Sequence, residues 1–99
     1  MQTKGLADEE VIEKARWLWE NGSVHRTAHF EVELKNAGAT MMDAEDMLFG
    51  ESRIAKAEWN PDHHQWRCTI LGYDDDGCEL HLVVSIDIRN SKLILITAF

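Results

Sequence analysis

The apolar residues of this chain change their spacing near Gly50, and this change constrains the fold more than any other feature. Before Gly50 they recur every three or four residues, as on one face of a helix. After Gly50 they alternate with polar residues, as in strands. A helical half followed by a strand half predicts an α+β domain. The 99 residues suit a single domain over 1–99, with helices at about 8–49 and a sheet at about 52–99.

Three helices are predicted in the first half of the chain. The first begins at the acidic residues that follow Ala7, where the helix dipole favours negative charge, and it ends before Gly22. Thr27 can cap the N-terminus of the second helix. Thr40 and Asp43 have the spacing of a capping box, which predicts the start of the third helix.

The second half predicts four strands joined by short turns, at 53–59, 66–73, 78–87 and 92–99. The turns are too short for a crossover between parallel strands. We therefore expect a four-stranded antiparallel meander with the N-terminal helices packed on one of its faces. The last strand is apolar on both faces, because Leu93 and Leu95 alternate with two isoleucines, so it should lie centrally or be covered on both sides. An apolar face that nothing in the monomer covers would mark a dimer or partner surface.

The strand at 78–87 has one apolar and one largely polar face. Side chains on a strand alternate between faces. The predicted core face holds Leu80, Leu82, Val84 and Ile86. The opposite face holds Glu79, His81, Val83, Ser85 and Asp87. His81 therefore does not interrupt the core.

The loop at 74–77 sets which residues lie opposite His81. If a turn of two or four residues closes the hairpin, Ile70 lies opposite His81. Cys68 is then diagonal to His81 on the same face, and Arg67 lies on the other face. A nucleophile pair of Cys68 and His81 is conceivable, but no third residue is evident to orient the imidazole. A loop of three or five residues would reverse these assignments.

The two cysteines, Cys68 and Cys78, would face opposite sides of the sheet in that register, so we expect no disulfide between them. Reduced cysteines are typical of the cytoplasm. The N-terminus lacks the apolar core of a signal peptide, and no apolar run approaches the roughly 20 residues that span a bilayer. We expect a soluble, cytoplasmic protein with no membrane contact.

The charge of the chain disfavours some partners. Eighteen acidic and ten basic residues give a formal net charge of -8, and the acidic residues are spread along the chain. Because phosphate binding draws on clustered Lys and Arg, we expect no nonspecific nucleic-acid binding. The acidic surface either keeps the protein soluble or binds a basic partner, as an inhibitor or nucleic-acid mimic does.

No metal or cofactor site is predicted. Asp62-His63-His64 lacks the spacing of a metal motif, and a solvated turn is the better interpretation. The acidic turn at 74–77 lacks the alternating ligands and the distal Glu of a calcium-binding EF-hand. The chain contains no phosphate loop and no dinucleotide fingerprint.

The landmarks of the chain follow one another in the order "TAHFEVELKNAGATMMDAEDML", "WRCTILGYDDDGCELHLVVSID" and "KLILITAF". This order resembles the bacterial domain-of-unknown-function family numbered 4258, over roughly residues 24 to 99. The resemblance implies a fold similar to the RelE/ParE-type toxins and messenger-RNA interferases of toxin-antitoxin modules, some of which are ribonucleases. His29 matches the family's helix-start histidine and His81 its strand histidine. The chain departs from the family pattern with Glu33 in place of an arginine and Phe99 in place of a tyrosine.

Two functional hypotheses follow. A metal-independent endoribonuclease needs a general base, a general acid and a cation at the phosphate. His29 and His81 would supply the base and the acid, and Arg67 the cation, with Arg53 and Arg89 as alternatives. The acidic charge and the missing arginine favour a protein-interaction domain without enzymatic activity. We expect a protein partner, either antitoxin-like or a second copy that associates through the sheet.

Overall fold

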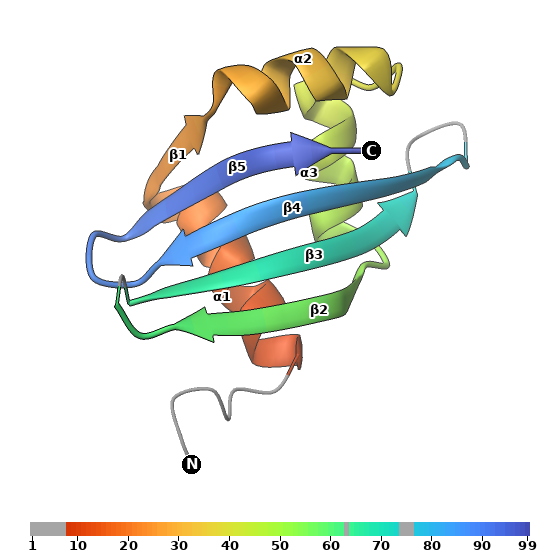
Figure 1. The fold of residues 1–99 in the computed structure, drawn as a ribbon. Coiled ribbons are helices and arrows are strands. Elements are labelled where there is room, and N and C mark those ends of the chain that lie inside the picture. The colour runs from red at the N-terminus through yellow and green to blue at the C-terminus, as the bar shows by residue number, and fades with distance from the viewer. Residues whose placement is uncertain (1–7, 63, 74–76) are drawn as a thin grey trace.

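The computed structural model describes residues 8–62, 64–73 and 77–99, and it contains three helices and one five-stranded sheet (Figure 1). In chain order the elements are α1 (Asp8–Asn21), β1 (Ser23–Arg26), α2 (Ala28–Asn36), α3 (Met41–Phe49), β2 (Arg53–Asn60), β3 (Gln65–Tyr73), β4 (Glu79–Asp87) and β5 (Lys92–Ala98). The α+β class is confirmed. None of the helices in these ranges is long and apolar enough to cross a membrane.

The sheet is mixed, which corrects the predicted four-stranded antiparallel meander. Its strand order is β1-β5-β4-β3-β2, and β2 to β5 form the expected meander. The additional strand β1 pairs with β5 in parallel, with Val24 opposite Leu93. Sequence patterning missed β1 because it has four residues and three of them are exposed, so no apolar alternation marks it. β5 lies between β1 and β4, which confirms its predicted central position.

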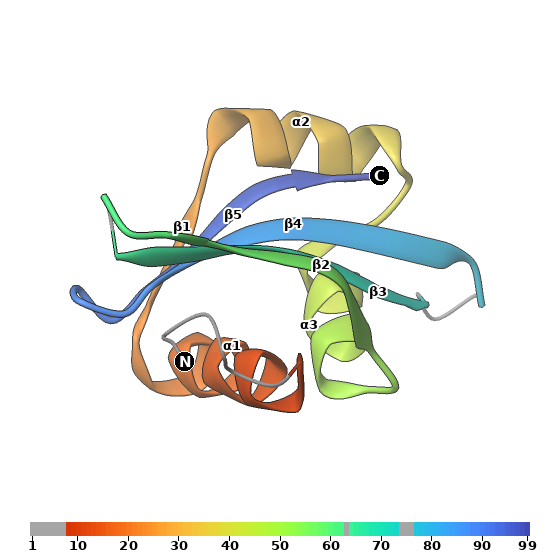
Figure 2. The same ribbon diagram turned by 60° about the horizontal axis from the view of Figure 1, so that its bottom comes forward.

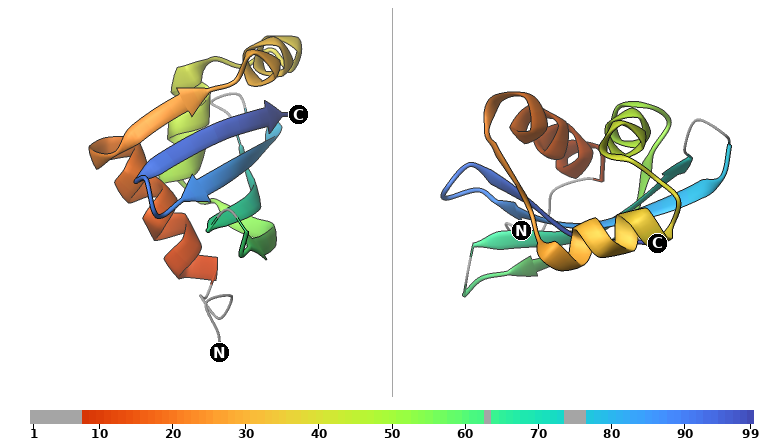
Figure 3. Two further views of the ribbon diagram at one scale, coloured as in Figure 1. Left: turned by 60° about the vertical axis from the view of Figure 1, so that its left-hand side comes forward. Right: turned by 90° about the horizontal axis from the view of Figure 1, so that it is seen from above.

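The sequence predicts that all helices pack on one face of the sheet. The structure shows that this prediction is wrong. Figure 2 shows α1 and α3 together on one face of the sheet, while α2 lies beside β5 at the β1 edge. Both views of Figure 3 show the same arrangement. The hydroxyl of Thr27 donates to the backbone carbonyls of Leu95 and Ile96 at 3.1 Å and accepts from the backbone N–H of Phe30 at 3.0 Å. Thr27 therefore both caps α2 and fixes its start beside β5.

The core lies between the sheet and the pair formed by α1 and α3. The sheet contributes buried residues from three strands: Trp66, Cys68, Ile70, Leu80, Leu82, Val84, Ile86, Leu93, Leu95 and Ala98. The predicted core face of the strand at 78–87 is thus confirmed. A Cβ at Gly72 would clash with the side chain of Met47, so the glycine allows α3 to approach β3 closely. Cys68 is buried and Cys78 is exposed, and no disulfide joins them, as predicted.

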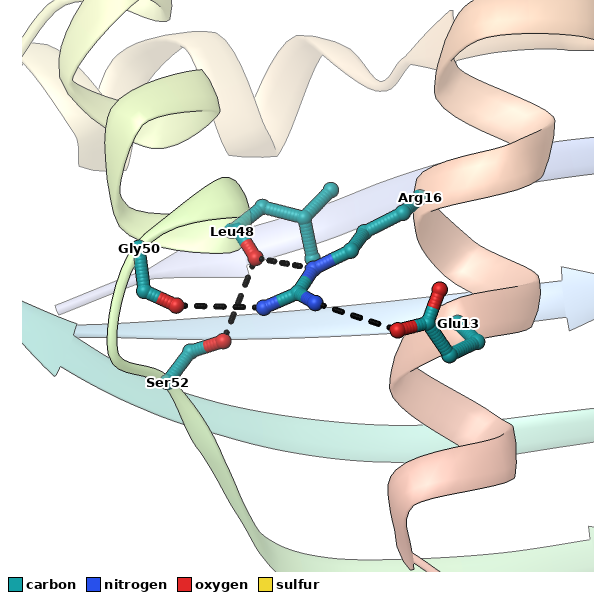
Figure 4. Close-up of polar contacts among 5 residues, drawn as sticks. All are labelled: Glu13, Arg16, Leu48, Gly50 and Ser52. Carbon is teal, nitrogen blue, oxygen red and sulfur yellow. Dashed lines mark hydrogen bonds and ion pairs between the residues drawn. The ribbon is translucent and has the colours of Figure 1, made fainter.

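Both ends of α3 are satisfied by side chains. At its N-terminus the predicted capping box is present, with Thr40 and Asp43 each bonding the other's backbone N–H. At its C-terminus the guanidinium of Arg16, from α1, donates to the carbonyls of Leu48 (2.8 Å) and Gly50 (3.1 Å), as Figure 4 shows. A cation at this position donates to carbonyls that have no partner within the helix, and it interacts favourably with the negative end of the helix dipole. Arg16 therefore joins α1 to the end of α3.

Candidate functional site

The register of β3 and β4 differs by one residue from the first alternative that the sequence offered. Leu71, not Ile70, lies opposite His81. Five residues separate the two strands, so the loop has the odd length that reverses the face assignments. Arg67 therefore shares a face with His81, whereas Cys68 is buried on the opposite face. The conceivable pair of Cys68 and His81 is excluded by this register.

We call the side of the sheet that points away from α1 and α3 the outer face. Residues paired directly across neighbouring strands lie in rows on it. The row that contains His81 consists of Arg53, Leu71, His81 and Phe99. The next row consists of Lys56, Thr69, Val83 and Thr97. A third row consists of His25, Ile94, Ser85, Arg67 and Glu58.

The environment of His81 is half-buried and partly aromatic. Its side chain is 26% exposed, and its Nε2 lies 3.5 Å from Oε1 of Glu79. Its ring packs on the ring of Phe99, with centroids 4.7 Å apart. Tyr73 and Phe99 are exposed by 61% and 58%, so large aromatic surface is available at this end of the outer face. Interfaces between proteins are enriched in such residues.

An open pocket of about 460 Å³ adjoins the row of His81. Its lining includes Arg53 and Leu71 from that row, together with Tyr73 and Glu79. These four side chains combine a cation, an anion, an aromatic ring and an aliphatic group. The lining of the pocket therefore does not define one small-molecule chemistry.

The predicted catalytic residues lie in different parts of the fold. His29 is exposed in the first turn of α2, and within the described ranges its side chain has no hydrogen bond, ion pair or ring contact. Arg67 and His81 share the outer face, but Arg67 lies opposite Ser85. Four residues along β4 then separate the two positions by about 13 Å. Arg53 is nearer, in the same row as His81. The joint catalytic use of His29, His81 and Arg67 stays a prediction.

The arginines divide into two groups. Three have partners within the fold: Arg16 at the end of α3, Arg26 with Glu31, and Arg89 with His64. The other two, Arg53 and Arg67, are exposed and have no hydrogen bond or ion pair among the described residues. Both lie on the outer face. No sequence pattern signals this division, because it depends on which carbonyls and carboxylates the fold brings near each arginine.

Charge is segregated between the two layers of the molecule. α1 has five acidic and two basic residues and α3 has three acidic ones, which gives this helical layer a formal charge of -6. The strands β2 to β5 have three acidic and four basic residues, for a formal charge of +1. A net charge of -8 thus conceals a sheet that is close to neutral.

At the far end of the outer face a polar network holds the turn between β4 and β5. Asp87 is only 5% exposed and accepts from the backbone N–H of Asn90 (3.1 Å) and from its side-chain amide (2.9 Å). The side-chain hydrogen bond from Asn90 is the main cause that lowers the pKa of Asp87, with smaller contributions from the backbone hydrogen bond, Lys92 and Gln65. Gln65 also accepts from the hydroxyl of Ser85 at 2.6 Å. The arrangement is that of a structural carboxylate.

No three His, Cys, Asp or Glu side chains of the described ranges lie close enough to hold a metal ion. In the predicted turns, His63 and the acidic residues 74–76 lie outside the described residues.

Comparisons of the chain with family models, with curated proteins and with solved structures give no significant match. The resemblance to the family numbered 4258 therefore stays an expectation.

Proposed function

We propose that this protein is a protein-interaction domain, without catalytic activity, that binds its partner through the outer face of the sheet. The proposal is carried by the composition of that face. Leu71, Val83 and Ile94 are partly buried on the outer face, and the exposed Tyr73 and Phe99 extend this surface. An apolar centre with aromatic residues and charges at its rim is typical of a protein interface.

The positions of the catalytic candidates support the absence of catalysis. General acid–base chemistry needs its groups within hydrogen-bond reach of the same substrate atoms. His29 is exposed on α2, at the edge of the sheet, and the ring of His81 is engaged by Phe99 and Glu79. We expect the partner to be antitoxin-like or a second copy of the chain, and the site of action to be the cytoplasm.

Each of two alternative functions is supported by a specific observation. A metal-independent endoribonuclease is supported by His81 and Arg67 sharing the outer face. An acidic inhibitor or nucleic-acid mimic is supported by the charge of the helical layer, which would attract a basic partner. The three functions use different surfaces or different chemistry, so one pair of experiments separates them.

Site-specific photo-crosslinking in cells tests the surface. A photo-reactive phenylalanine derivative is placed at Tyr73, on the outer face, or at Trp17, on α1. These positions are matched, since both side chains are aromatic and about half exposed, at 61% and 52%. The proposed function predicts a crosslinked protein from position 73 and none from position 17. The reverse result would favour the inhibitor, whose binding surface is the helical layer.

Inducible expression tests catalysis. The parent is compared with a His29→Ala/His81→Ala variant by growth and by total-RNA analysis. We expect intact RNA and the same growth from both. Cleavage of RNA by the parent alone would replace the interaction domain with the endoribonuclease.

A further inference from the structure

We infer that the partner presents an acidic, amphipathic segment, whose carboxylates pair with Arg53 and Arg67 and whose apolar side chains cover Leu71 and Val83. This inference rests on the proposed use of the outer face and adds the chemistry of its occupant. Its starting point is that Arg53 and Arg67 are the two arginines without a hydrogen bond or ion pair among the described residues, and that both lie on that face.

That neither arginine has a partner within the described part of the chain is informative, because the chain is so acidic. Acidic residues outnumber basic ones by eighteen to ten, and Arg16 and Arg26 each have a glutamate within 3.3 Å. Glu58, on the same face, is instead paired with Lys56 at 3.7 Å. A guanidinium presents its donors in a fixed fork that matches a carboxylate. The guanidinium groups of Arg53 and Arg67, which have no partner among the described residues, can therefore bind carboxylates of a partner protein.

Their spacing sets a pattern for the partner. Arg53 pairs with Leu71 across β2 and β3, and Arg67 precedes Leu71 by four residues on β3. The two positions are thus separated by about 13 Å along the strands and about 5 Å across them, or about 14 Å in all. On a helix, carboxylates on one face that reach both arginines would lie about seven or eleven residues apart, at about 1.5 Å per residue and about 3.6 residues per turn. On an extended segment they would lie about four residues apart.

Two other occupants fit the charges less well. In a dimer formed face to face, a second copy would bring its own Arg53 and Arg67 to the interface, while most of its acidic residues lie in the helical layer on the far side. RNA could stack on Tyr73 and Phe99, but the net charge of -8 opposes its approach. An acidic protein segment satisfies the arginines and the apolar centre together.

The test uses the full chain with the photo-reactive residue at position 73. Arg53→Glu/Arg67→Glu is compared with Lys14→Glu/Lys35→Glu, which makes the same charge change on α1 and α2. We expect the yield of the crosslinked product to fall roughly tenfold or more in the arginine variant and to stay within about twofold in the lysine variant. Mass spectrometry of the crosslinked peptide is expected to show a segment of net negative charge. Arg53→Gln/Arg67→Gln, which adds no acid, should also lower the yield, and circular dichroism of each variant confirms folding.

The contrary results are distinct from a failure of the proposed function. A yield that the arginine variant does not lower would overturn the inference but not the interaction domain. The same conclusion follows if the crosslinked segment is basic or belongs to a second copy of the chain. A crosslink to RNA would overturn both. No crosslink from position 73 in the parent would reject the outer face as the binding surface.

Discussion

The ring of His81 packs on the ring of Phe99, with centroids 4.7 Å apart, and the two residues exchange backbone hydrogen bonds of 2.7 Å and 2.9 Å. Phe99 thereby continues the pairing of β5 with β4 beyond the last strand residue, Ala98. His81, which lies on the largely polar face of an otherwise apolar strand, is one half of an aromatic pair on the outer face. Its ring contact gives it a structural role that requires no catalysis.

Replacing His81 should therefore affect stability through Phe99. We expect His81→Ala to lower the free energy of unfolding by about 0.5–1.5 kcal/mol, the range measured for aromatic pairs. His81→Phe should recover most of this loss, because it keeps a ring beside Phe99. Urea denaturation of the three proteins provides the measurement. A loss that phenylalanine does not recover would mean that His81 stabilises the fold through Glu79 instead.

The pH dependence of stability should contain a contribution from Asp87. Its hydrogen bonds hold its pKa below the usual range, so the folded state favours the ionised form. This contribution is complete above the pKa of the unfolded chain, about 3.9, and it is lost as pH falls through the lower pKa of the folded state. Asp87→Ala should cost about 1.5–3 kcal/mol at pH 7, because it removes hydrogen bonds to a charged group.

The pH dependence of this contribution is measured by thermal unfolding of the parent and of Asp87→Ala from pH 7 down to pH 2. The gap in stability between the parent and Asp87→Ala should narrow as pH falls below about 4. Asp46→Ala, at an exposed acidic residue of α3, serves as the control and should show little change. A gap that stays constant down to pH 2 would show that ionised Asp87 does not stabilise the fold.

Arg16 should contribute more stability than the exposed Arg26. Arg16→Met removes the charged hydrogen bonds to the carbonyls of Leu48 and Gly50, at the end of α3, and leaves each carbonyl only its hydrogen bond from Ser52. We expect a loss of about 1–3 kcal/mol, as for other hydrogen bonds of charged groups. Arg26→Met removes only a half-exposed ion pair with Glu31 and should cost less than about 1 kcal/mol. Equal losses in the two variants, measured by urea denaturation, would contradict this role of Arg16.

Gly72 and Met47 should be energetically coupled. Gly72→Ala places a methyl group where Met47 packs, so we expect a loss of about 1–3 kcal/mol from overpacking. In Gly72→Ala/Met47→Ala the clash is absent, and the double variant should be more stable than the sum of the two single losses predicts. A double-mutant cycle by chemical denaturation measures this coupling. Simple additivity would indicate that α3 moves to accommodate the methyl group.

Local patterns in the sequence predicted the elements that depend on near neighbours. The Thr40 capping box, the Thr27 cap and the four strands of the meander were all predicted, and each depends on residues a few positions apart. The core face of the strand at 78–87 followed from alternation alone. Of the candidate site, the sequence supplied His81 and its polar face, because the period of a strand determines which side chains share a side.

The tertiary structure alone decided the rest. Pairing of β1 with β5 joins Val24 to Leu93, and no local pattern signals a contact between residues so distant in sequence. The residue opposite His81 depends on whether the loop between β3 and β4 has an odd or an even number of residues. A shift of one residue in the register exchanges the faces to which the side chains of a strand point. Arg53 and Arg67 have no hydrogen bond or ion pair among the described residues because the fold places carbonyls and carboxylates within reach of the other arginines instead. Long-range proximity is thus the physical quantity that the sequence did not reveal.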